Sequence, residues 1–204
     1  MTPLPSSPAS PLAPSHATAP LTATPGTPGT PGGAPEPSAA GPRHRPLPIA
    51  PAVLAALRGT DDAGRPAVPF ADPEGGAPLR CCLRRSRPGE SLALVSYAPL
   101  RRWAAERGAE PGAYDEQGPV YVHAAECGGP AGGQGYPFLR PGAVRVLRRY
   151  DARGRIAGGR LLELTDAPDG GLDAALDEAF EDPAVVLAHL RFAEFGCFQY
   201  EVRR

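Results

Sequence analysis

The stretch Gly118–Cys127, GPVYVHAAEC, combines the pattern of a buried strand with two chemically reactive side chains. Its opening Gly-Pro pair excludes a helix that begins earlier, and the β-branched and aromatic residues that follow favour a pleated strand. Alternation places the two valines on one face and Tyr121 and His123 on the other. We therefore predict an interior strand that carries His123 where it ends, with Cys127 in the glycine-rich loop that follows.

Patterns on both sides of this stretch predict further strands and two helices. A helix is expected at 51–57, where a proline in first position precedes good helix formers, and the clearest helix is Leu172–Glu181, with apolar residues at helical spacing. Strands are expected at 79–84, 92–97, 118–124, 144–150, 156–164, 184–192 and 197–202. The fold class is therefore α+β: a mostly antiparallel sheet of about six to seven strands with one main helix packed on a face.

The N-terminal segment, residues 1–46, is rich in Pro, Ala, Gly and Thr and has almost no large apolar side chain. Such a segment buries too little surface to offset the entropy of ordering, so we predict a disordered tail. Residues 47–204 are predicted to form a single α+β domain.

Composition excludes several functions. The formal net charge is -1, which argues against nucleic acid or an anionic membrane as partner, and the absence of Lys excludes a Schiff-base or phosphate-loop lysine. We find no cofactor motif and expect no cofactor. The bias toward Ala, Gly, Pro and Arg is typical of a GC-rich bacterial genome. Lacking a basic leader and an apolar export segment, the chain is expected in the cytoplasm, with its four cysteines as free thiols.

One hypothesis is a thiol or metal site at the ends of predicted strands, formed by His123, Cys127, His189 and Cys197. Thiolates and imidazoles bind Zn²⁺ or Fe²⁺, and a Cys beside a His can be a nucleophile, so His123, Cys127 and Cys197 are also the candidate catalytic residues. The spacing matches no standard zinc motif. We favour the opposing interpretation, without a metal, in which Cys81, Cys127 and Cys197 fill core space and each histidine satisfies one partner.

A second hypothesis places a small-molecule pocket on two neighbouring strands, lined by Arg148, Tyr150, His189 and Arg191. Guanidinium groups bind carboxylates or phosphates in a bidentate way, so an anionic metabolite or a peptide terminus would fit. In the alternative, the two arginines pair with glutamates of neighbouring strands, namely Glu163, Glu194 or Glu201. Acidic residues in turns and loops, such as Asp115 and Glu116, are expected to be simply solvated.

The segments GPVYVHAAEC, LRRYDARGRI and EDPAVVLAHLRFAEFGCFQYEVRR resemble the bacterial family named domain of unknown function 1203, over about Leu79 to Arg204. The resemblance implies a small α+β domain and no known activity. We predict a small, soluble, non-catalytic binding or interaction domain, for which an anionic small molecule or peptide is a candidate ligand. The alternative is a Cys/His site that acts as a metal-binding or thiol-nucleophile enzyme.

Overall fold

The computed structural model describes residues 41–132 and 135–204. These residues form seven strands in two antiparallel sheets, three α-helices and one 3-10 turn, η1 (Gly112–Tyr114). The predicted antiparallel α+β class is thereby confirmed. The strands divide into two sheets, which periodicity alone does not reveal. None of the helices in the described part of the chain has the length and apolar character needed to cross a membrane.

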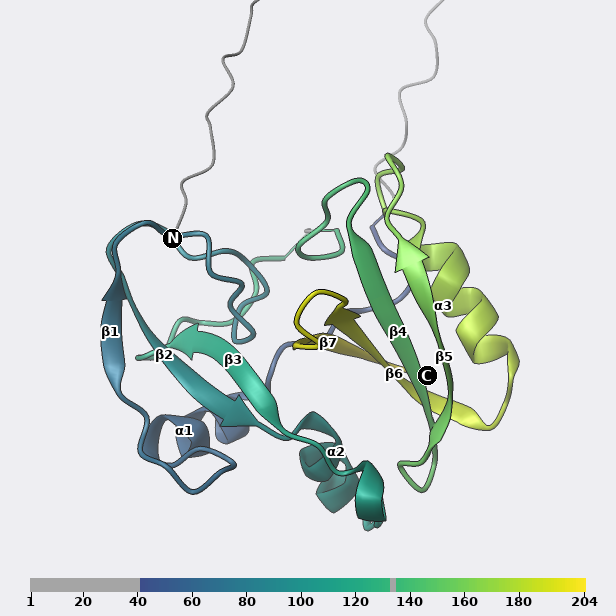
Figure 1. The fold of residues 1–204 in the computed structure, drawn as a ribbon, viewed down its shortest axis with the longest axis horizontal. Helices are drawn as coiled ribbons and strands as arrows, with labels where there is room; N and C mark the ends of the chain where they lie inside the picture. The colour runs from purple at the N-terminus through teal and green to yellow at the C-terminus, as the bar shows by residue number, and fades with distance from the viewer. Residues whose placement is uncertain (1–40, 133–134) are drawn as a thin grey trace, which may run out of the picture. The chain divides into compact units, whose positions relative to one another are not determined.

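The first sheet has the strand order β1 (Pro69–Asp72), β2 (Glu90–Tyr97), β3 (Gly118–His123). The second has the order β5 (Ile156–Glu163), β4 (Val144–Asp151), β6 (Val185–Phe192), β7 (Phe198–Arg203). Three helices, α1 (Pro51–Gly59), α2 (Pro99–Arg107) and α3 (Leu172–Glu181), lie against these strands (Figure 1). The predicted bounds of α3 agree with the structure.

The helix α3 covers one face of the four-stranded sheet (Figure 1). Leu172 and Leu176 are fully buried and share a core with Leu147, Leu190 and Tyr200 from the strands. The helix buries this face because its apolar residues recur at helical spacing, while its acidic residues lie on the outer side.

The first sheet has its own core and meets the second sheet through Phe198. Leu54 and Leu57 of α1 pack with Val122 of β3, and Phe198 of β7 belongs to the same core. The rings of Phe198 and Tyr97 meet edge to face with centroids 5.5 Å apart. Residues at the start of β7 therefore contact both sheets.

The predicted strand at 79–84 is wrong, because these residues form a tight turn. The Leu79 N–H donates to the Arg84 carbonyl at 2.9 Å, and the Leu83 N–H donates to the Leu79 carbonyl at 2.9 Å. Leu83 has a φ of 56°, a backbone conformation that a leucine rarely adopts. The strand that pairs with β2 in place of 79–84 is β1, in the register Phe70 opposite Leu92.

The predicted disordered tail falls outside the described residues up to residue 40. The described part that follows contacts α3: the Arg43 guanidinium lies 2.7 Å from a carboxylate oxygen of Asp177, and the His44 ring lies 2.7 Å from the other. Further along, the Leu47 N–H donates to the Glu201 carbonyl at 2.8 Å. Contacts with the folded domain therefore begin a few residues before Leu47.

We predict that Leu176→Ala lowers the free energy of unfolding by about 2–5 kcal/mol, because it leaves a cavity between α3 and the second sheet. Leu161→Ala, on the exposed face of β5, should change it by less than about 0.5 kcal/mol. Urea unfolding followed by circular dichroism measures both. Equal losses in the two variants would contradict the packing described for α3.

Candidate metal centre

The turn at 79–84, which we call the cysteine turn, is hydrogen-bonded to the end of β3. The Arg80 N–H donates to the Tyr121 carbonyl at 3.0 Å, and the Ile49 N–H donates to the Arg80 carbonyl at 2.9 Å. These bonds attach both sides of the turn to the folded domain. As a result, Cys81 and Cys82 lie beside His123, the last residue of β3.

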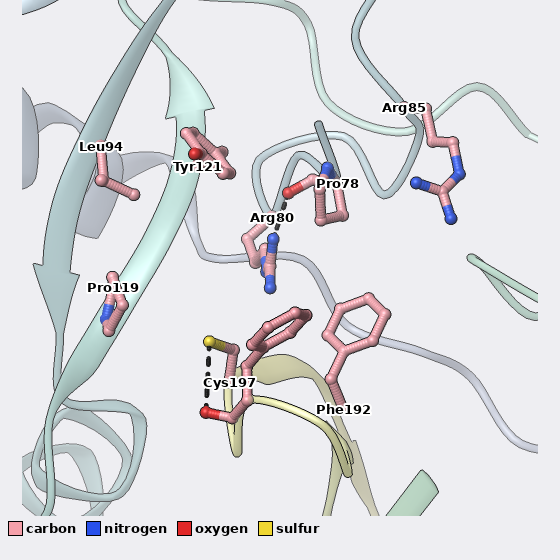
Figure 2. A pocket seen from close by; sticks show the side chains of 9 residues that line it. Pro78, Arg80, Arg85, Leu94, Pro119, Tyr121, Phe192 and Cys197 are labelled. Carbon is pink, nitrogen blue, oxygen red and sulfur yellow. Dashed lines mark hydrogen bonds between the residues drawn. The ribbon is translucent and has the colours of Figure 1, made fainter. Parts of the chain in front are cut away.

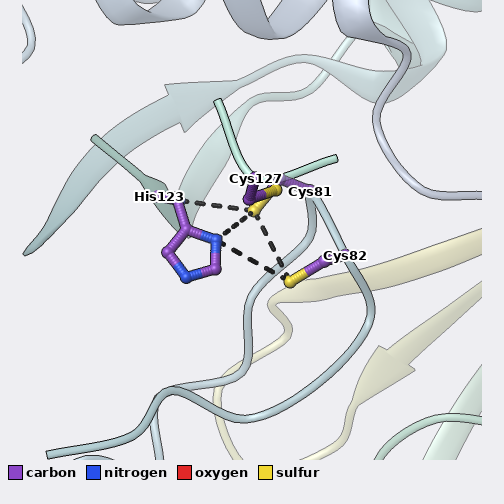
Figure 3. A group of neighbouring side chains, drawn as sticks. All are labelled: Cys81, Cys82, His123 and Cys127. Carbon is purple, nitrogen blue, oxygen red and sulfur yellow. Dashed lines mark hydrogen bonds between the residues drawn. The ribbon is translucent and has the colours of Figure 1, made fainter. Parts of the chain in front are cut away.

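Four side chains converge at this place: Cys81, Cys82, His123 and Cys127 (Figure 3). The Nδ1 atom of His123 lies 3.3 Å from the Cys81 Sγ and 3.8 Å from the Cys82 Sγ. The two sulfurs are 3.9 Å apart. With Cys127 included, all four donor atoms lie within 4.8 Å of one another.

These separations fit a tetrahedral zinc ion. Zn–S bonds of about 2.3 Å and Zn–N bonds of about 2.0–2.1 Å place neighbouring ligand atoms about 3.5–3.8 Å apart. The distances among Cys81, Cys82 and His123 are close to these values. Three thiols and one imidazole are also one of the donor sets found in structural zinc sites.

The outer nitrogen of His123 contacts a carboxylate. Its Nε2 lies 3.3 Å from Glu90 Oε2 and 3.2 Å from Arg84 Nη2, and Arg84 in turn holds Glu90 with bonds of 2.9 and 2.7 Å. A histidine that binds a metal through Nδ1 carries its proton on Nε2 and usually donates it to a carboxylate or carbonyl. Glu90 is placed to accept that proton, whereas the opposite tautomer would accept a hydrogen bond from Arg84.

The site stabilises negative charge on sulfur. The Cys81 thiol donates a hydrogen bond to Cys82, and this bond, helped by the backbone of Arg84, lowers the pKa of the Cys82 thiol to about 6. Its role as donor, together with burial, raises the pKa of Cys81. The backbone N–H of His123 donates to the Cys81 sulfur at 3.3 Å. Metal ions bind thiolates, so the pair Cys81 and Cys82, which shares one negative charge, is suited to bind a cation.

Cys127 reaches the cluster because the loop after β3 is fixed by α1. The Arg58 side chain donates to the His123 carbonyl at 3.1 Å and to the Ala125 carbonyl at 2.8 Å. The Ala124 N–H donates to the Ser91 carbonyl at 3.1 Å, which extends the β2–β3 pairing into the loop. Cys127 itself is half-buried, at the outer side of the cluster.

The structure brings His123 and Cys127 together, and in the described ranges it joins them to neither His189 nor Cys197. His189 is fully buried, with its ring 4.7 Å from that of Tyr150 and its Nε2 3.8 Å from Glu201. The Cys197 thiol lies 3.6 Å from the Phe195 carbonyl, at the β6–β7 turn. The second pair is separated from the first because it belongs to the other sheet.

The four residues expected to bind an anion lie close together: Arg148 pairs with His189, the His189 ring contacts Tyr150, and Arg148 and Arg191 share one ion-pair partner. A carboxylate of the same chain is already there: Arg148 and Arg191 both form an ion pair with Glu116, the latter at 2.7 Å. Glu116 was expected to be simply solvated. It comes from the segment before β3, so the arginine partner is not one of the strand glutamates that the sequence suggested.

Sequence reasoning missed Cys81 and Cys82 as site residues, because residues 79–84 alternate like a strand and a strand would direct adjacent thiols to opposite faces. The residue with positive φ in this turn is Leu83, and a leucine at that position gives no sign of a turn in the sequence, as Gly or Asn would. Glu90 was missed because its partner His123 is 33 positions away in the sequence.

A family model described as "Protein of unknown function (DUF1203)" matches residues 76–204. The chain belongs to this family. The resemblance noted from about Leu79 onward is therefore confirmed, and the DUF1203 region contains all four residues of the Cys/His cluster. Comparisons with curated proteins and with solved structures found no match.

The buried His189 should make the stability of this DUF1203 domain depend on pH. Burial lowers the pKa of His189 from its ordinary value of 6.5, partly offset by Glu201. Below about pH 6.5 this histidine is protonated in the unfolded chain but stays neutral in the folded chain. The free energy of unfolding therefore falls as pH falls, by up to about 1.4 kcal/mol per pH unit. The decline ends at the folded-state pKa.

His189→Phe keeps a ring between Tyr150 and Phe198 and removes this titration. Urea unfolding at about pH 7 and about pH 5.5 should show a smaller loss of stability in the variant than in the wild type. Groups that do not contact His189 contribute alike in both proteins and cancel in the comparison. An equal loss would mean that His189 is protonated in the folded state.

Proposed function

We propose that this DUF1203 domain is a non-catalytic zinc-binding domain, in which Cys81, Cys82, His123 and Cys127 coordinate one Zn²⁺. The supporting observation is the convergence of all four donor atoms within 4.8 Å. Structural zinc sites take all four ligands from the protein, whereas catalytic sites leave one position open for water or substrate. Four protein donors therefore favour a structural ion. This proposal differs from the interpretation favoured from the sequence, in which no metal is bound.

The donor set favours zinc over harder cations. Thiolates are soft ligands that select Zn²⁺ or Cu⁺, or take part in iron–sulfur clusters, whereas Mg²⁺ and Ca²⁺ prefer oxygen. An imidazole beside three thiolates, in a tetrahedral arrangement, is typical of zinc.

The metal would join the side chains of three segments, in addition to the hydrogen bonds that hold their backbones. Cys82 and His123 are 41 positions apart in the sequence, and Cys127 lies in a loop without secondary structure of its own. Closing a long loop restricts the unfolded chain most, so an ion at this place stabilises the folded domain. The proposed role is thus to hold the cysteine turn, the end of β3 and the following loop in one arrangement.

A thiol nucleophile is the alternative use of the same side chains. A nucleophilic cysteine needs a thiolate that a substrate can approach. The residues Cys81 and Cys82 are only 1% and 4% exposed, which restricts that approach. Burial of this kind suits a metal ligand better than an attacking group.

The first experiment measures metal content and thiol protection in the full-length protein. We expect one zinc per chain by elemental analysis, and Co²⁺ substitution should give the visible spectrum of tetrahedral thiolate coordination. Cys81, Cys82 and Cys127 should resist alkylation until a chelator is added, because bound thiolates are shielded. Cys197 provides an internal reference, since its alkylation should not depend on the chelator.

Matched variants separate metal binding from general packing. Cys82→Ser and Cys127→Ser should lose most of the zinc, while Cys197→Ser should retain it. A protein that holds no metal, and whose four thiols react at the same rates with and without chelator, would refute the proposal. Rapid alkylation of Cys82 in that metal-free protein would support the nucleophile instead.

Glu90→Gln should lower zinc affinity by about 10–100-fold, because it removes the carboxylate that orients and polarises His123. Competition with a chromophoric chelator measures the affinity. Glu163→Gln, an exposed carboxylate on β5, is the control and should bind zinc like the wild type. If Glu90→Gln also leaves zinc affinity unchanged, His123 does not depend on Glu90 for its orientation.

A further inference from the structure

A pocket of about 580 Å³ lies where the two sheets meet (Figure 2). One wall consists of Leu94, Pro119 and Tyr121 from β2 and β3, and the other of Phe192 and Phe195 from the end of β6 and the turn after it. Its size is within the range of small-molecule sites, about 300–1,000 Å³. Leu94 is 49% exposed and Phe195 is 80% exposed, so apolar surface here has no covering partner in the described chain.

Arg80 lies at this pocket and is buried, with only 2% of its surface exposed. Its Nε donates to the Phe198 carbonyl at 2.8 Å and its Nη1 to the Pro78 carbonyl, and its guanidinium lies 5.7 Å from the centre of the Phe192 ring. These partners are neutral, and no carboxylate of the described residues forms an ion pair with it. Burial accordingly lowers the pKa of Arg80 to about 10.

A buried guanidinium without an anion is costly, since the attraction of a counter-charge normally offsets the loss of hydration. Of the other two buried arginines in the described chain, Arg191 has that counter-charge in Glu116, whereas Arg145 is bonded to two carbonyls and does not line the pocket. A second cation, Arg85, also lines the pocket, and none of its lining residues is acidic. Positive charge beside apolar walls is complementary to a ligand that is anionic at one end and apolar at the other.

We infer that this pocket binds a small carboxylate with an apolar tail. The carboxylate contacts the guanidinium groups of Arg80 and Arg85, and the tail covers Leu94, Tyr121 and Phe195. Guanidinium and carboxylate are matched in shape as well as charge, because two parallel N–H donors face two oxygens. This proposed anion site is distinct from the Arg148–Arg191 pair predicted from the sequence, where Glu116 offsets one of the two positive charges. The inference does not depend on zinc binding, because none of the four cluster residues lines this pocket.

The test compares octanoate with 1-octanol, which have the same tail and differ in charge. Isothermal titration of the full-length protein should show octanoate binding at least about tenfold more tightly, because only the carboxylate forms charge-assisted hydrogen bonds to the arginines. Equal affinities, or no binding of octanoate, would overturn the inference.

Variants place the ligand in the pocket. Phe195→Glu puts a negative charge at an exposed position on the wall and should weaken octanoate binding by at least about tenfold through like-charge repulsion. Leu161→Glu changes another strongly exposed apolar residue, on β5 outside the pocket; it is the matched control and should bind like the wild type. Wild-type affinity in Phe195→Glu would overturn the inference.

Arg80→Met tests the buried cation directly. It keeps an apolar chain in place and should reduce octanoate affinity to that of 1-octanol, at least about a tenfold loss. Unchanged octanoate affinity in this variant would exclude Arg80 as the anion ligand. If Arg80→Met does not fold, the comparison of Phe195→Glu with Leu161→Glu decides whether octanoate binds in this pocket.

Discussion

The hydrogen bond from the Arg80 N–H to the Tyr121 carbonyl is the constraint on which both sites depend. It ties the cysteine turn to β3, in the register of a parallel bridge between Leu79 and Tyr121. From this fixed backbone, Cys81 and Cys82 reach His123 while the Arg80 side chain reaches the other sheet at Phe198. A short segment of irregular chain therefore supplies two chemically different groups to two places.

The arginine side chains near the two sites have three kinds of partner. Arg148 and Arg191 share one carboxylate, Glu116, which offsets one of their two charges, and Arg84 pairs with Glu90, which also contacts His123. Arg80 has neutral carbonyls instead. A buried ion without a counter-ion costs several kcal/mol. Arg145 is also buried and bonded to carbonyls, but it does not line the pocket, whereas Arg80 does.

The sequence predicts the elements whose pattern is local. The bounds of α3 and the existence of the strand that ends in His123 follow from periodicity within each segment, and both are found in the structure. The prediction that this strand is interior is wrong, because β3 lies at the edge of its sheet. The cysteine turn could not be predicted in this way, because Leu83 takes a positive φ without the Gly or Asn that usually marks it. Glu116 and Glu90 acquire their partners only after distant segments meet, which no local pattern encodes.

Adjacent cysteines can serve one site only when a turn directs both thiols to the same side. A strand would separate them, and the common Cys-x-x-Cys spacing achieves the same convergence by another local geometry. Here the turn brings the two sulfurs to 3.9 Å. An ion held by them would restrain the backbone of Arg80, the residue that precedes Cys81 in the chain.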